Sequence, residues 1–233
     1  MNASARQLAL ALPHRTALAR EDFLVAPSNA AAVAMIDRWP GWPSHAILLV
    51  GPAGSGKSHL VEVWRQLSGA RRIAAGKLRP LDVPSLLETG ALAIEDTPGG
   101  RLDETALFHL LNLAGQQGAK LLITAATHPA SWGVALPDLA SRLRAAPAIE
   151  LGPPDDELLR GVLVKLFADR QLAVDEPLVS FLLTRMPRSF DAARLLVAEI
   201  DRRALEERAE VTRNFAARVL ATFAAPGLFG EED

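Results

Sequence analysis

The chain has 233 residues, of which 49% are hydrophobic, so it is long enough for one α/β domain and a small appended domain. It contains no cysteine, which excludes disulfides and thiolate metal sites and is typical of a reducing cytoplasm. Its 25 basic and 27 acidic residues give a net charge of -2, which does not favour strong direct DNA binding. No apolar run approaches the roughly 18 residues of a membrane span, so we expect no membrane association.

Residues 1–20 contain no pattern typical of a folded domain. Leu8, Leu10 and Leu12 alternate with smaller residues and are followed by Pro13, which predicts an extended segment. Taken by itself, such a pattern is most simply interpreted as a frayed tail. The stretch lacks the charged start, long apolar run and cleavage site of a signal peptide, so we expect none.

Residues 21–152 alternate between strand and helix patterns. A helix is predicted at 31–38, where Pro40, Gly41 and Pro43 end it, and the apolar run at 46–50 is typical of a buried parallel strand. Further strands are predicted at 72–75, 91–94, 120–126 and 148–151, with helices at 57–67, 104–114 and 137–143. This alternation predicts the α/β class, with a doubly wound, parallel five-stranded sheet.

The sequence Gly152, Pro153 and Pro154 breaks this pattern. Beyond it only helical periodicity is found, at 155–170, 176–184, 189–207 and 212–222. We therefore expect an extended segment at 1–20, an α/β domain at 21–152, a small all-α domain at 153–225 and a flexible tail at 226–233.

A glycine-rich loop follows the first strand of the α/β domain. Residues 51–58 match the phosphate-binding pattern G-x-x-x-x-G-K-[ST] in full, between an apolar strand and a helix. The glycines let backbone N–H groups and the helix N-terminus point at an anion, while Lys57 neutralises phosphate oxygens and Ser58 binds Mg²⁺. The chain is therefore predicted to be a P-loop NTPase-type protein that binds ADP or ATP. The expected nucleotide contacts are Gly51, Pro52, Ala53, Gly54, Ser55, Gly56, Lys57, Ser58 and His59.

Two carboxylates end the strand predicted at 91–94, where ligands bind in parallel sheets. One of Glu95 and Asp96 is expected to hold Mg²⁺ together with Ser58, and the other to orient the attacking water. A pair of solvated loop acids is the alternative. Asp is usual at the first position, so Glu95 weakens the expectation of efficient hydrolysis. The polar sensor on the strand at 120–126 is either Thr127 or replaced by Ala126, a second hint of poor hydrolysis.

Two arginines are candidates for contact with phosphate. Arg142 precedes the last strand, where in AAA+ assemblies an arginine faces a neighbour's nucleotide and accelerates phosphoryl transfer by ~10³ to 10⁵. An ion pair with Asp138 at i,i+4 is the alternative. Arg188, after Pro187, opens the long helix of the all-α domain and can reach back to the β- and γ-phosphates. Its alternative is an ordinary exposed residue in the first helical turn.

At these residues the chain resembles the Hda family of DnaA-related AAA+ proteins, in the short form called HdaA, over almost its full length. Residues 22–25, followed by Ser28 and Asn29, resemble the segment that lines the adenine pocket, which implies contacts from Phe23 and Val25. Residues 136–143 are similar to the arginine-finger box, which implies the finger role for Arg142. Residues 188–190 look like the second sensor and the all-α domain like the AAA+ lid. We expect no counterpart of the helix-turn-helix domain that follows the lid in DnaA.

The resemblance also gives the N-terminal segment a role. Residues 7–12 are similar to the clamp-binding motif Q-L-x-L-P-L of the family, with Ala11 where Pro is frequent. An extended peptide with alternate anchors is a common recognition mode. The implied clamp-binding residues are Gln7, Leu8, Leu10 and Leu12.

The resemblance implies a negative regulator of DNA replication initiation. Bound to the sliding clamp, the beta subunit of DNA polymerase III, such a protein stimulates hydrolysis of ATP held by DnaA, using Arg142 in trans. ADP is the nucleotide that the family holds, and the chain is expected to activate the ATPase of DnaA more than to hydrolyse ATP itself. It is expected in the cytoplasm, at the replisome, and a homo-oligomer is left open.

Two other functions fit the same motifs. The first is a DnaA-like or helicase-loader-like ATPase that acts directly on DNA, against which the mildly acidic charge argues. The second is a small-molecule kinase, which the helical lid and the lack of an acceptor site disfavour.

Overall fold

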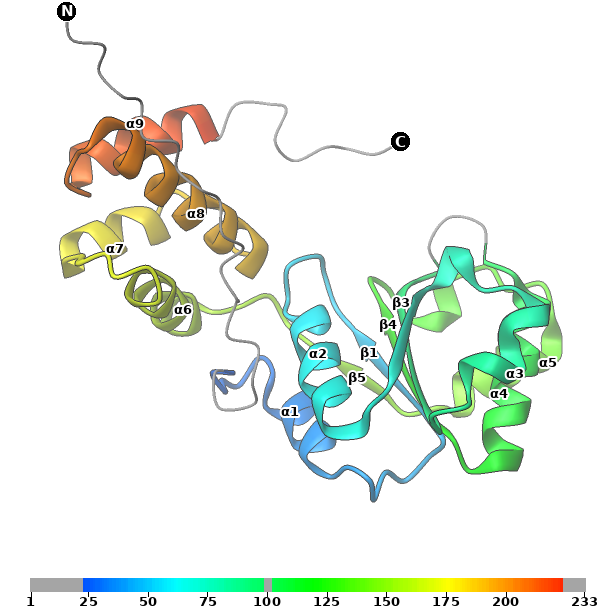
Figure 1. Cartoon of the computed structure of the whole chain (residues 1–233). Helices are drawn as coiled ribbons and strands as arrows, with labels where there is room; N and C mark the ends of the chain where they lie inside the picture. The colour runs from blue at the N-terminus through cyan, green and yellow to red at the C-terminus, as the bar shows by residue number, and fades with distance from the viewer. Residues whose placement is uncertain (1–22, 99–101, 224–233) are drawn as a thin grey trace, which may run out of the picture. The chain divides into compact units, whose positions relative to one another are not determined.

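The structure is a computed structural model that describes residues 23–98 and 102–223 (Figure 1). These residues form two compact units that separate between Asp155 and Asp156. Each unit is described by itself below, as the α/β unit, residues 23–155, and the helical unit, residues 156–223. The predicted segments 1–20 and 226–233 lie outside the described residues.

The α/β unit contains one parallel sheet of five strands in the order β2-β3-β4-β1-β5. The strands are β1 (Ala46–Val50), β2 (Arg71–Ala74), β3 (Ala91–Thr97), β4 (Lys120–Ala125) and β5 (Ala148–Glu150). All five residues of the central strand β1 are buried, because helices cover both faces of a parallel sheet. The predicted five-stranded parallel α/β fold is confirmed.

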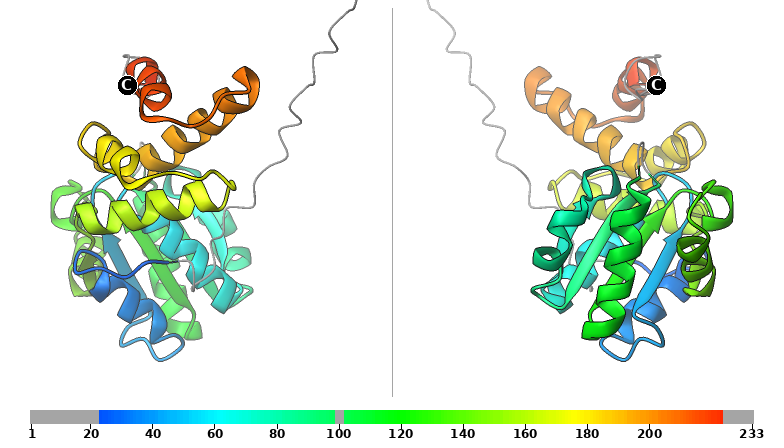
Figure 2. Two further views of the ribbon diagram at one scale, coloured as in Figure 1. Left: turned by 90° about the vertical axis from the view of Figure 1, so that its left-hand side faces the viewer. Right: turned by 90° about the vertical axis from the view of Figure 1, so that its right-hand side faces the viewer.

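Helices cover the two faces of the sheet in two sets. The helices α1 (Ala30–Asp37) and α2 (Lys57–Ser68) share a core with Ile47 and Leu49, whereas Leu48 and Val50 point to the opposite core. That second core is closed by α3 (Val83–Leu86), α4 (Glu104–Gln117) and α5 (Pro137–Ala145). The right-hand view of Figure 2 faces this second layer, with α4 across the sheet and α5 beside it. Consequently α2 and α5 lie on opposite sides of the sheet (Figure 1).

The structure adds short elements that the sequence patterns did not predict. Between β2 and β3 the chain forms two 3-10 turns, η2 (Ala75–Lys77) and η3 (Pro80–Asp82), before α3. A third 3-10 turn, η4 (Pro129–Ser131), precedes α5. Strand β3 also continues to Thr97 and carries a register shift between Ile94 and Thr97, beyond its predicted end at residue 94.

The helical unit contains α6 (Asp156–Ala168), α7 (Glu176–Leu183), α8 (Phe190–Glu207) and α9 (Arg213–Phe223). Leu163, Phe167, Leu196 and Phe215 are among the side chains of its apolar core. Side-chain caps define two helix starts, because Asp175 and Ser189 accept hydrogen bonds from the backbone N–H groups of Leu178 and Ala192. The predicted all-α domain is therefore found as four helices within the described residues. In the described part of the chain, no helix is both long and apolar enough to cross a membrane.

Candidate functional site

The glycine-rich loop joins the carboxyl end of β1 to the start of α2. Gly54 and Gly56 have φ of 71° and 96°, which only glycine adopts at little cost, and Gly56 immediately precedes α2. A Cβ atom on Gly51 would lie 2.4 Å from the carbonyl oxygen of Leu151, so the loop begins in direct contact with the end of β5. This backbone shape aims the N-terminus of the twelve-residue helix α2 at the loop, as anion binding requires.

Lys57 folds back over the loop that precedes it. Its Nζ donates hydrogen bonds to the carbonyl oxygens of Gly51, at 2.7 Å, and Pro52, at 2.8 Å. The ammonium group is therefore held at the loop, where it can exchange these carbonyl oxygens for phosphate oxygens. The hydroxyl of Ser55 is buried in the loop without a hydrogen-bond partner among the described residues.

The two carboxylates at the end of β3 lie in different environments. Glu95 is buried, whereas Asp96 is exposed and has φ of 59°, within the irregular part of β3. The backbone N–H of Asp96 donates to the buried hydroxyl of Thr124 in β4, at 3.2 Å. Strand β4 lies between β1 and β3 in the sheet, and Thr124 is the β4 hydroxyl that contacts this pair. The predicted sensor positions Ala126 and Thr127 are both exposed.

Burial and a nearby cation act in opposite directions on Glu95. Burial raises the pKa of Glu95, and the charge of Arg72 and the neighbouring side chain of Ser58 partly oppose the rise. Nη1 of Arg72 lies 3.3 Å from Oε2 of Glu95, whereas Oε1 is buried and accepts no hydrogen bond among the described residues. A buried carboxylate with an unsatisfied oxygen beside a P-loop serine is a chemically suitable ligand for Mg²⁺.

The predicted metal ligands Ser58 and Glu95 therefore lie close together. Within the described ranges, no group of three or more His, Cys, Asp or Glu side chains could hold a metal ion. A magnesium ion at Ser58 and Glu95 would thus need phosphate oxygens and water for its remaining ligands, as Mg²⁺ usually does at nucleotide sites. Bound there, the ion would neutralise phosphate charge.

The predicted adenine segment is held by Asn29. Its side-chain Nδ2 donates to the carbonyl oxygen of Leu24, and its Oδ1 accepts from the N–H of Ala26. Phe23 is buried and its ring meets the ring of His59 edge-on, with centroids 4.9 Å apart, while Val25 is exposed. The two residues expected to contact the adenine therefore differ in exposure, because the side chain of Phe23 is buried and that of Val25 faces solvent.

Arg142 is exposed on α5. Glu104 of α4 positions the start of α5, because its carboxylate accepts hydrogen bonds from the N–H groups of Ala135 and Leu136. The guanidinium carbon of Arg142 lies 5.6 Å from the centroid of the Phe108 ring on α4. In the described chain no ion pair joins Arg142 to Asp138, so the alternative expected from their spacing is not found.

The surroundings of Arg142 are positively charged. Burial, followed by the charges of Arg142 and Lys120, lowers the pKa of His45, the residue before β1. The helix α5, which carries Arg142, lies on the sheet face opposite α2 (Figure 1), and the charge of Arg142 acts on His45, next to the amino end of β1. Its observed contacts are thus with Phe108 and the surroundings of His45.

Arg188 lies in the helical unit, just before α8. Its Nη2 is 2.8 Å from Oδ1 of Asp156 at the start of α6, and both side chains are about 60% exposed. It was predicted to open the long helix, but α8 begins at Phe190 after the Ser189 cap, so Arg188 precedes the helix. The reason is that Ser189 adopts extended backbone angles and provides the cap, which the arginine side chain cannot do.

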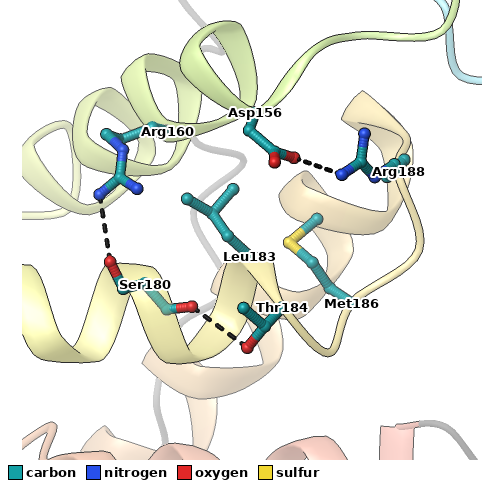
Figure 3. A pocket seen from close by; sticks show the side chains of 7 residues that line it. All are labelled: Asp156, Arg160, Ser180, Leu183, Thr184, Met186 and Arg188. Atoms are coloured by element: carbon teal, nitrogen blue, oxygen red, sulfur yellow. Dashed lines mark hydrogen bonds and ion pairs between the residues drawn. The ribbon is translucent and has the colours of Figure 1, made fainter.

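Arg188 borders a pocket of about 400 Å³ within the helical unit (Figure 3). Its walls come from α6, α7 and the chain before α8, with Arg160 on one side and Leu183 and Met186 at the apolar floor. Arg160 is paired with Glu176 and also donates to the hydroxyl of Ser180. The pocket therefore combines paired cations with an apolar surface.

Several residues of these sites were not predicted from the sequence. They are Arg72, Phe108, Thr124 and Asp156. Arg72 is the one with a recognisable signal, because it occupies a short strand whose neighbour carries the two carboxylates. The contacts of Phe108 and Asp156 depend on how helices pack, which a single sequence does not reveal. The predicted clamp-binding residues Gln7, Leu8, Leu10 and Leu12 lie outside the described residues.

Comparisons with known proteins identify the fold. No model of a known protein family matches this chain. Domain III of the replication initiation protein DnaA from Thermotoga maritima is 21% identical, with a TM-score of 0.75 over 92% of this chain and 100% of that one. AMPPCP-bound DnaA from Aquifex aeolicus is 18% identical, with a TM-score of 0.66 over 82% of this chain and 69% of that one.

A second group of similar structures belongs to RuvB. A variant of Thermotoga maritima RuvB is 14% identical, with a TM-score of 0.69 over 88% of this chain and 72% of that one. At such identities the likeness shows the fold alone. The chain therefore has a DnaA-like AAA+ fold, and the predicted AAA+ architecture is confirmed.

Proposed function

We propose that this chain is a DnaA-related regulator of the Hda type. It binds an adenine nucleotide at residues 51–58, docks on the sliding clamp and stimulates hydrolysis of ATP bound to DnaA. Arg142 enters the nucleotide site of DnaA in trans as an arginine finger. The protein so limits initiation of DNA replication, in the cytoplasm at the replisome.

The phosphate loop supports the nucleotide part of this proposal. Gly54 and Gly56 give it the required backbone shape, and Lys57 is held at the loop by two carbonyl oxygens. Glu95 and Ser58 provide a site for Mg²⁺ beside it. Among known structures of this fold, one is of DnaA bound to AMPPCP and single-stranded DNA. We propose ADP as the resident nucleotide of this chain, because Glu95 and Ala126 replace residues that favour turnover.

The position of Arg142 is the observation that carries the regulatory part. Its side chain is exposed, stacks on Phe108 and forms no ion pair among the described residues, so its full charge is available to a partner. The helix α5 that carries it packs on the sheet face opposite α2, which supports a role towards the nucleotide of another molecule. An arginine in trans supplies charge to the transferring γ-phosphoryl group.

The partners of the proposal come from the sequence. Residues 7–12 carry the clamp-like pattern with Gln7, Leu8, Leu10 and Leu12, and they precede the DnaA-like core. Docking on a DNA-loaded clamp would bring Arg142 near DnaA without a DNA-binding surface on this chain. The net charge of -2 agrees with that arrangement.

The decisive experiment measures hydrolysis of ATP bound to DnaA in the presence of DNA-loaded clamp and this chain. Arg142→Ala is expected to lower the stimulated rate at least ~10²-fold, because an arginine finger contributes ~10³ to 10⁵. Arg144→Ala is the matched control, because Arg144 is an exposed arginine two residues along the same helix. It should retain most of the stimulation.

Two results would contradict the proposal. Normal stimulation by Arg142→Ala removes the finger role. Equal loss with both variants indicates a general basic docking surface instead. Nucleotide binding and retention on immobilised clamp, measured on the same proteins, should be unchanged in both variants, which separates the finger from folding and docking.

A second candidate function is an AAA+ ATPase that acts directly on DNA. The similar structures favour it, since one of them is named as a Holliday junction branch migration motor and another contains single-stranded DNA. Filter binding of the chain to duplex and single-stranded DNA at moderate salt, without clamp, distinguishes the two. Tight binding supports the second function, and its absence supports the first.

A further inference from the structure

Arg72 contacts the carboxylate that was predicted to serve the metal. Strand β2 pairs in parallel with β3, and Ala74 lies opposite Glu95 in that register. Nη1 of Arg72 is 3.3 Å from Oε2 of Glu95, whose side chain is only 11% exposed. The side chain of Arg72 is 51% exposed, so its guanidinium reaches the buried carboxylate from the surface of the sheet edge.

The neighbouring arginine behaves differently. Arg71 donates from Nη1 to the backbone carbonyl oxygen of Ser85, at 2.6 Å, and contacts no carboxylate among the described residues. Side chains alternate between the faces of a strand, so Arg71 and Arg72 point to opposite sides of β2. The pairing with Glu95 is therefore specific to Arg72 and not a general property of a basic edge.

Glu95 requires a cation for physical reasons. Its Oε1 is buried without a hydrogen-bond partner in the described structure, and a buried carboxyl group stays ionised only when it is paired or bound to a metal. A guanidinium is charged at all accessible pH values. Arg72 therefore supplies at Oε2 the positive charge that Mg²⁺ supplies in many phosphate sites.

We propose that Arg72 is a resident counter-cation of Glu95 that takes the electrostatic place of Mg²⁺. As a result, the chain binds a nucleoside diphosphate with little dependence on the metal. The inference rests on the proposed binding of nucleotide at residues 51–58. Arg72 is here a positioning residue, because it acts on the phosphate site through Glu95.

Removing the positive charge of Arg72 should change how the affinity for ADP depends on Mg²⁺. Without Arg72, the Glu95 carboxylate is uncompensated and repels the phosphates of ADP unless Mg²⁺ binds between them. Binding in the absence of metal should therefore weaken, while binding in its presence is restored. The ratio of the two dissociation constants isolates this effect from general damage to the loop, which would change both constants together.

The experiment is calorimetric titration of the full chain with ADP, in excess Mg²⁺ and in EDTA. For the unaltered chain we expect the two dissociation constants to agree within about twofold, and for Arg72→Gln we expect their ratio to rise about 5- to 10-fold. Arg71→Gln is the matched control and should behave as the unaltered chain. Arg72→Lys keeps the charge and should restore most of the metal independence.

Each outcome decides the inference. A ratio above about tenfold in the unaltered chain, or an equal ratio in Arg72→Gln and Arg71→Gln, overturns it while leaving nucleotide binding intact. No ADP binding by the unaltered chain overturns the proposed function and this inference together. Because the unaltered chain alone can refute the idea, the test stands even if Arg72→Gln does not fold.

Discussion

Each unit carries one of the two arginines that are candidates for contact with phosphate, and these two arginines differ in what holds them. Arg142 of the α/β unit lies over the ring of Phe108, which orients a guanidinium without neutralising it. Arg188 of the helical unit is paired with Asp156 at 2.8 Å, so most of its charge is already satisfied. An aromatic contact leaves a cation ready for a partner, whereas a carboxylate contact must be exchanged before the cation can bind an anion. The difference agrees with the proposed role of Arg142 towards another molecule and with the expected response of Arg188 to a bound ligand.

Among the tests of this difference between Arg142 and Arg188, removal of Arg188 is expected to have the largest effect, on the affinity for nucleotide. If Arg188 acts as the second sensor that the resemblance implies, Arg188→Ala should weaken the binding of ATP about 10-fold and that of ADP less, because one charge-assisted hydrogen bond to the terminal phosphate would be lost. Competition titration with a fluorescent nucleotide measures both affinities. Arg142→Ala is the control and should leave both unchanged. Equal loss in the two variants would mean that the arginines do not have separate roles.

The aromatic contact of Arg142 can be tested without touching the arginine. Phe108→Leu keeps an apolar side chain but removes the ring, so stimulation of DnaA should fall about 2- to 5-fold. Phe108→Tyr retains the ring and should restore it. The readout is the ATP hydrolysis rate of DnaA with loaded clamp, alongside the affinity for nucleotide, which should not move. Loss of stimulation in both variants would point to altered packing of α4 and α5.

The carboxylate contact of Arg188 predicts a change in the opposite direction. Asp156→Asn removes the competing charge and should tighten ATP binding about 2- to 3-fold, a small change because an exposed ion pair contributes little. The matched control is Asp191→Asn, since Asp191 is paired with Arg194 and not with Arg188. Unchanged or weaker ATP binding in Asp156→Asn would show that Asp156 does not restrain Arg188.

Acid should affect the two units with opposite sign. Hydrogen bonds from Arg202 and Arg203 to Glu199 of α8 outweigh the opposing effect of burial and lower the pKa of Glu199 to about 2. The stabilisation from this carboxylate is present above about pH 4.5 and is lost as the pH falls from there towards 2. The partner Arg202 is half exposed, so we expect the free energy of unfolding to fall by only about 1 kcal/mol. Burial raises the pKa of Glu95, so protonation of that carboxylate favours the folded α/β unit instead.

Urea unfolding of the full chain at pH 7 and pH 3, followed by signals from each unit, measures this difference. Trp42 and Trp64 are buried in the α/β unit, so their fluorescence reports on that unit, and circular dichroism at 222 nm weights the helices. Glu199→Gln should remove its share of the acid dependence of the helical unit. An unchanged pH profile in this variant would show that Glu199 contributes nothing measurable.

The sequence was sufficient for the sheet and insufficient for the contacts between side chains. The apolar run at 46–50 and the glycine-rich loop after it were found at their predicted places, because a buried strand and a P-loop have strong local patterns. The 3-10 turns between β2 and β3 carry no such periodicity and were missed. The helix predicted at 189–207 was found one residue shorter, at Phe190–Glu207, because Ser189 caps it, and Arg188 therefore precedes the helix that it was expected to open.

The candidate site divides in the same way. Lys57, Ser58 and Glu95 were named from spacing, since the loop and the next strand define them locally. Which of Glu95 and Asp96 serves the metal was left open, and their different burial depends on the irregular register of β3. The partners Arg72, Phe108 and Asp156 come from neighbouring elements and required the packed structure.

The crowding at Gly51 has a mechanical consequence. The N–H of Leu151 donates to the carbonyl oxygen of Val50, and the N–H of the next residue, Gly152, donates to the carbonyl oxygen of Ser28. These contacts join the start of the phosphate loop and the adenine segment to the same two residues, Leu151 and Gly152. A side chain added at Gly51 would clash with Leu151 and strain the backbone where the chain leaves the sheet. Such a substitution would therefore alter the structure beyond the phosphate loop itself.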